Sequence, residues 1–146
     1  MKSFFLKIGL VCLMLLASAL KAAALDGVVI IANQSVPADS ISAAELKDVY
    51  IGRTTYWTDG QSVKLAVLDD QITDETDAAL EEVSGMDSTS QFKTFWQRMV
   101  FSGRGQMPKE IGDTASLVAY VASTKGAIAI VLADADLKGV KTLEVK

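Results

Sequence analysis

Histidine is absent from the 146 residues, and the only cysteine, Cys12, lies near the N-terminus. A Ser-His-Asp or Cys-His nucleophile is therefore excluded, and so is a zinc site built on imidazole and thiolate ligands. A single cysteine also excludes an intramolecular disulfide. The 18 acidic residues permit a carboxylate pair of the glycosidase type, but the sequence singles out no two of them. We therefore expect no catalysis and no cofactor.

An excess of positive charge is also lacking, because 14 Lys and Arg face 18 Asp and Glu, for a net charge of −4. Nucleic-acid binding normally requires a basic surface, so we expect no nucleic-acid partner. The acidic segment Asp69–Asp74 lacks the central glycine and the terminal glutamate of a calcium-binding loop. We therefore interpret it as a solvated loop and expect no metal.

The first 24 residues have the pattern of a secretory signal peptide. Two lysines precede an apolar run, 8–20, which is shorter than the roughly 20 residues of a membrane span. The small residues Ala22 and Ala24 favour cleavage before Leu25, whereas Lys21 is the one feature that favours an uncleaved anchor. Cys12 lies inside the apolar run, so we assign it to the leader rather than to a lipid attachment site. Residues 25–146 are then one exported domain, located in the periplasm.

The best-defined element of that domain is a helix predicted over 42–51. Ser42 and Glu45 have the spacing of a capping box, and Ile41 and Leu46 have that of a hydrophobic staple. Gly52 follows the helix and can adopt the left-handed conformation that closes it. The local sequence therefore predicts both ends of this helix.

Strands and further helices alternate along the rest of the domain. Apolar or alternating runs predict strands at 28–32, 62–68, 127–132 and 140–145. Helices are predicted at about 74–83, from a capping box at Ser88 and Gln91 over the apolar stripe Phe92, Phe95, Trp96 and Met99, and at 113–123. The order favours an α/β domain in which helices cover a small mixed sheet.

A glycine-rich turn, Ser102-Gly103-Arg104-Gly105, follows the aromatic helix. Glycines let backbone N–H groups surround an oxyanion, and an arginine adds a matched pair of donors. The turn is not a Walker loop, because no Gly-Lys-Ser or Gly-Lys-Thr follows it. The alternative is a connector with a solvated arginine.

Several motifs occur together in a fixed order: the strand 30–33, a block from Gly52 to Trp57, and Gly126-Ala127-Ile128. This set resembles the periplasmic phosphate-binding-protein-like family, the substrate-binding components of phosphate ABC transporters. The resemblance implies one lobe of a type II periplasmic binding protein, with about four or five strands flanked by helices. Full-length members have two lobes, and this chain resembles one of them only, the second.

The resemblance also implies a site. Phosphate-binding members carry an arginine and a Ser-Gly-Thr turn after the strand that corresponds to 63–68, where this chain has Asp69, Asp70, Gln71 and Thr73. The implied ligand residues are Gln71, Thr73, Ser102, Gly103 and Arg104. The implied function is binding of phosphate or another oxyanion in uptake, with an ABC permease as partner. The alternative is an envelope adaptor that has lost anion binding and acts through another envelope protein. A homodimer would rebuild a cleft from two copies.

Overall fold

The computed structural model describes residues 25–69 and 74–146. The predicted leader, 1–24, lies outside the described residues, and so do two of the predicted ligand residues, Gln71 and Thr73. Within the two described ranges, no helix is long and apolar enough to cross a membrane.

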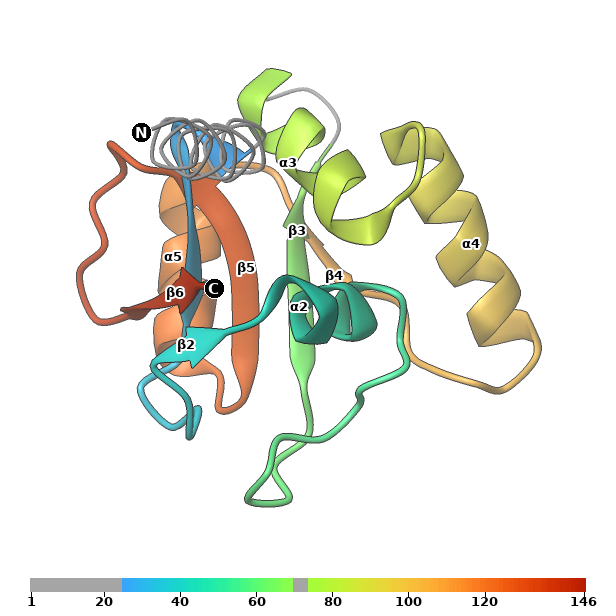
Figure 1. Ribbon diagram of the computed structural model, residues 1–146, viewed down its shortest axis with the longest axis horizontal. Helices are drawn as coiled ribbons and strands as arrows, with labels where there is room; N and C mark the ends of the chain where they lie inside the picture. The colour runs from blue at the N-terminus through green and yellow to red at the C-terminus, as the bar shows by residue number, and fades with distance from the viewer. Residues whose placement is uncertain (1–24, 70–73) are drawn as a thin grey trace, which may run out of the picture.

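One mixed sheet of six strands forms the centre of the molecule, in the order β2-β6-β1-β5-β3-β4 (Figure 1). The strands are β1 (Val28–Ala32), β2 (Ser40–Ile41), β3 (Lys64–Leu68), β4 (Lys109–Ile111), β5 (Ala127–Leu132) and β6 (Lys141–Val145). β1 runs antiparallel to β5 and β6, whereas β3 runs parallel to both β5 and β4, and β2 runs parallel to β6. The four predicted strands are confirmed. β2 and β4 were not predicted, because two and three residues are too few to show an alternating pattern.

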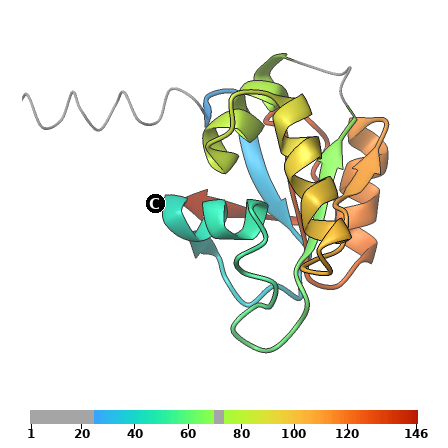
Figure 2. The ribbon, with the colours of Figure 1, turned by 90° about the vertical axis from the view of Figure 1, so that its right-hand side faces the viewer.

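Among the described elements, four helices cover this sheet: α2 (Ala43–Tyr50), α3 (Asp74–Ser84), α4 (Thr89–Phe101) and α5 (Thr114–Ser123). Helices α2, α3 and α4 lie on one face and α5 lies on the other, as Figure 2 shows from the side. Both faces of the sheet are therefore buried, as expected for an α/β layered domain.

The central strand β5 shows how its sequence serves both faces. Ile128 and Ile130 pack with α2, α3 and α4, whereas Ala127 and Ala129 face α5. All four residues are buried. Bulky side chains thus fill the three-helix layer, and small ones leave room for α5 to approach the sheet. A strand buried on both faces accounts for the continuous apolar run.

Both hydrogen bonds of the capping box predicted for α2 are present. The Glu45 backbone N–H donates to Ser42 Oγ at 3.1 Å, and the Ser42 N–H donates to Glu45 Oε2 at 2.9 Å. The predicted capping box at Ser88 forms only one of its two bonds, because Gln91 Oε1 accepts from the N–H of Asp87 instead of Ser88. The glutamine side chain is long enough for its amide oxygen to reach the N–H of Asp87 as easily as that of Ser88.

Candidate functional site

A groove of about 1040 Å³ lies where β3 and β4 begin. Its walls come from the loop after α2, the first residues of β3, the segment from Gly103 into β4, and single residues of α4 and α5. We call it the Arg104 groove. The residues used below are Thr54, Thr55, Tyr56, Lys64, Trp96, Gly103, Arg104, Gly105, Met107, Lys109, Glu110 and Thr124.

Positive charge dominates this groove although the chain is acidic. Of its four charged lining residues, Lys64, Arg104 and Lys109 are cations and only Glu110 is an acid. Glu110 Oε1 lies 3.5 Å from Lys93 Nζ, so its charge is already offset by a neighbour. Within the described residues, none of the three groove cations forms an ion pair. The groove therefore attracts anions while the molecule as a whole carries net negative charge.

Trp96 holds the wall of the groove in place. Its indole Nε1–H donates to the carbonyl oxygen of Tyr50 at 3.1 Å, which ties α4 to the end of α2. A Cβ at Gly52 would lie 2.9 Å from the Trp96 ring, and one at Gly105 would lie 3.2 Å from it. The ring therefore packs closely against two glycines, Gly52 and Gly105, so the groove is formed before any ligand arrives.

The turn that carries Arg104 is closed by its own helix. The backbone N–H groups of Ser102, Gly103 and Arg104 donate to the carbonyl oxygens of Arg98, Val100 and Met99 at 2.9–3.0 Å. These three N–H groups terminate α4 and do not face a ligand. Gly103 and Arg104 line the groove, whereas Ser102 does not. The backbone cradle predicted for this turn therefore does not form from these three N–H groups, and the Arg104 guanidinium is the donor that lines the groove.

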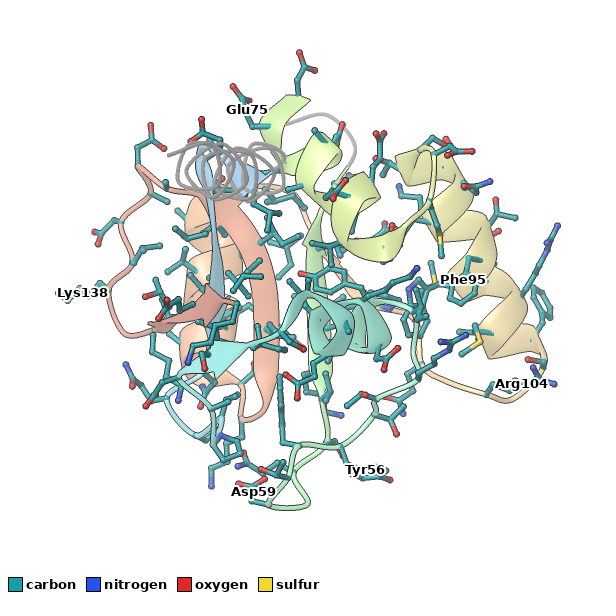
Figure 3. All side chains as sticks on the ribbon, in the orientation of Figure 1. Tyr56, Asp59, Glu75, Phe95, Arg104 and Lys138 are labelled. Carbon is teal, nitrogen blue, oxygen red and sulfur yellow. The ribbon has the colours of Figure 1, made fainter. Side chains whose placement is uncertain are left out.

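The other predicted ligand residues, Gln71 and Thr73, follow the C-terminal end of β3. Gln71 and Thr73 lie outside the described residues, but both flanks of their segment are placed. On one flank, the backbone N–H of Asp69 donates to the carbonyl oxygen of Ile111 at 2.9 Å, and Asp69 Oδ1 lies 3.7 Å from Lys93 Nζ. On the other flank, Asp74 begins α3. Neither flank lines the Arg104 groove, which takes its residues from the start of β3. Figure 3 shows Glu75, in the first turn of α3, far from Arg104.

Among the described residues, a small pocket lies beside the start of α3. A pocket of about 20 Å³ lies beside Thr76 and Asp77, and Tyr50 reaches it from α2. The Tyr50 hydroxyl is buried and, within the described residues, has no hydrogen-bond partner. Burial raises the pKa of this phenol, so it stays protonated. A cavity of this size holds one water molecule and no tetrahedral anion.

Sequence reasoning found Arg104 but missed Lys64, Lys109 and Tyr56. Lys64 lies within the predicted strand 62–68, and Lys109 lies outside every predicted element. The pairing of β3 with β4 and of β3 with β5 brings their segments together. The sequence offered one usable signal, a lysine near the start of the predicted strand 62–68, whereas β4 is too short for its Lys109 to be recognised as the start of a strand. Among the described residues, no group of three or more acids, histidines or cysteines could hold a metal ion.

Comparison with known proteins places the chain in a family. A family profile described as a PBP superfamily domain matches residues 19–144. No curated protein sequence matches the chain at a significant level.

Solved structures match the fold. An ABC-type phosphate transport receptor from Vibrio cholerae is 20% identical with a TM-score of 0.58, and PstS from Borrelia burgdorferi is 11% identical with a TM-score of 0.61. A Clostridium perfringens protein crystallised with bound phosphate is 16% identical with a TM-score of 0.61. Each match covers 82% of this chain but only 44–47% of the other. The chain therefore belongs to the PBP superfamily and has the fold of one lobe of a periplasmic binding protein.

Proposed function

We propose that this chain is an exported, non-catalytic binding lobe that takes an anionic ligand in the Arg104 groove. Phosphate is the first candidate ligand, and ABC-type uptake from the periplasm is the first candidate process. The observation that carries the proposal is the gathering in one groove of three cations that form no ion pair with any described residue, in a chain with a net charge of −4. Hydroxyl groups of Thr54, Thr55 and Thr124 line the same groove and add neutral donors.

Phosphate is proposed because structures of the same fold include a protein with bound phosphate and a phosphate transport receptor. The leader predicted over 1–24 supports export, and an ABC permease would be the partner in uptake. Gln71 and Thr73 remain predicted ligand residues at the other end of β3. Binding there would have to overcome the acids Asp74, Glu75 and Asp77 in the first turn of α3.

The test is isothermal titration of the purified protein with phosphate at low ionic strength, where exposed charges are least screened. We expect a saturable heat that Arg104→Gln weakens. Lys138→Gln is the matched control, because it removes the same charge from an exposed residue far from the groove (Figure 3). Absence of heat at millimolar phosphate would contradict phosphate binding.

The second candidate function is that of an envelope adaptor, and one specific observation favours it. In the described part of the chain, the exposed large hydrophobic side chains are Tyr56, Val100, Phe101 and Met107. Tyr56 and Met107 line the Arg104 groove, and Val100 and Phe101 lie in the last turn of α4, directly before the turn that carries Arg104. Inorganic phosphate needs no apolar contacts, whereas protein partners use them. Association with an envelope protein that depends on these side chains would distinguish the adaptor from an uptake protein.

A further inference from the structure

We propose that the Arg104 groove docks an extended, acidic segment of a partner protein that carries apolar side chains between its acids. This inference rests on the proposed function in one respect only, namely that the groove binds anionic groups. It names the class of ligand as an acidic peptide segment instead of a free inorganic ion.

The apolar side chains are the first argument. Phe101 is 92% exposed and Tyr56 is 63% exposed, which is unusual for aromatic rings on a monomeric surface. Tyr56 and Met107 line the groove, and Phe101 ends α4 directly before the turn that carries Arg104. Exposed apolar side chains grouped at one concave surface mark a protein contact more often than a small-ion site.

The distribution of charge is the second argument. Lys64 belongs to β3, Arg104 to the turn after α4, and Lys109 to β4, so the cations come from three segments. An extended ligand with several carboxylates can pair with all three. The groove volume of about 1040 Å³ lies at the upper end of pockets that hold drug-sized ligands. It therefore accommodates several peptide residues and is far larger than one phosphate ion requires.

Charge also selects a protein segment over other anionic partners. A net charge of −4 repels an anionic bilayer or a nucleic acid at long range, whereas a short acidic segment senses mainly the local cations. Two copies of the chain repel each other in the same way, so we expect the free protein to stay monomeric.

The groove is also rigid enough to bind a flexible segment. Trp96 is packed between Gly52 and Gly105 and bonded to Tyr50, so little ordering of the wall is needed on binding. A preformed surface leaves only the ordering of the peptide to oppose association.

The test uses a fluorescein-labelled peptide in which Asp and Glu alternate with Phe and Leu, followed by fluorescence anisotropy with the purified protein at low salt. One control peptide has Lys in place of the acids, and a second has Ser in place of Phe and Leu. We expect the acidic apolar peptide to bind and both controls to bind about tenfold more weakly or not at all. Arg104→Gln and Phe101→Ser should each weaken binding severalfold, and Lys138→Gln should not. Circular dichroism confirms that the variants are folded.

The outcomes separate the two proposals. Phosphate binding without peptide binding overturns this inference and leaves the proposed uptake function in place. Peptide binding without phosphate binding supports this inference and overturns uptake. If neither ligand binds, both proposals fail. Equal binding of the acidic and basic peptides, preferential binding to phosphatidylglycerol vesicles, or a solution mass that shows self-association through this surface also overturns this inference.

Discussion

The indole Nε1–H of Trp57 donates a hydrogen bond of 2.9 Å to the carbonyl oxygen of Gly126, 69 residues further along the chain. The same carbonyl accepts the N–H of Lys64 at 3.0 Å, at the start of β3. Two of the three sequence motifs that carry the family resemblance are therefore joined by one buried contact. This contact fixes the loop from Thr54 to Tyr56 next to β3, and both segments line the Arg104 groove.

Trp57→Phe should lower the free energy of unfolding by about 1–3 kcal/mol, because it leaves a buried acceptor with one bond fewer. Trp57 is 8% exposed, so water does not readily replace the lost donor. Urea denaturation measures the change. The neighbouring variant Tyr56→Phe removes a hydroxyl from an exposed ring and should change stability by less than about 0.5 kcal/mol. Equal effects of the two substitutions would contradict the role given to this bond.

Gly126→Ala should be more damaging than an ordinary glycine substitution. Gly126 has a φ of +78°, and a Cβ there would lie 2.1 Å from the backbone oxygen of Ser62. The matched control is Gly60→Ala, where φ is +87° and no atom lies within 4 Å of the added Cβ. The control should lose about 1–2 kcal/mol through the left-handed conformation alone.

Gly126→Ala should lose that amount plus about 1–3 kcal/mol for the forced backbone shift. Thermal and urea unfolding of both variants measure the difference. If Gly126→Ala were no less stable than Gly60→Ala, the close approach of the two chain segments would be wrong.

Much of the fold was predictable because its signals are local. The ends of α2 follow from Ser42, Glu45 and Gly52, which lie within a few residues of the bonds they form. β5 was predictable because a strand buried on both faces is apolar throughout. The hydrogen bond from Trp57 to the carbonyl oxygen of Gly126 was not predictable, because the two residues are 69 positions apart and no local pattern selects that acceptor.

The Arg104 groove shows the same limit. Arg104 stands in a recognisable glycine-rich turn, but the lysines that join it lie in two strands whose pairing is a non-local property. Sequence reasoning also treated the glycines of that turn as donors to an anion. The N–H of Gly103 already donates to the carbonyl oxygen of Val100, as the end of a helix requires.

Glu45 should make the stability of the protein depend on pH. The backbone N–H of Ser42 first, and then its hydroxyl, lower the pKa of Glu45 from the ordinary 4.5, because both bonds favour the charged carboxylate. A lowered pKa in the folded state stabilises the protein above the unfolded value. That stabilisation is lost as the pH falls through the folded value.

Glu45→Gln keeps an acceptor for the Ser42 N–H without the charge, so it isolates the titrating part. The stability of the wild type relative to Glu45→Gln should be greatest above about pH 5 and should decline toward pH 3. Urea denaturation across this range measures the difference. An NMR titration of the Glu45 carboxyl that gave a pKa at or above 4.5 would contradict the prediction.

Phe92 and Phe101 form a matched pair on α4 that separates the core from the proposed docking surface. Phe92 is 3% exposed and its ring packs against Tyr50 and Trp96 at centroid distances of 6.4 Å. Phe92→Ala should therefore cost about 3–5 kcal/mol of unfolding free energy. Phe101 is 92% exposed in the last turn of the same helix, so Phe101→Ala should change stability by less than about 0.5 kcal/mol. A residue that contributes nothing to folding is free to serve an interface, and a large loss of stability in Phe101→Ala would assign that ring to the core and remove it from the docking surface.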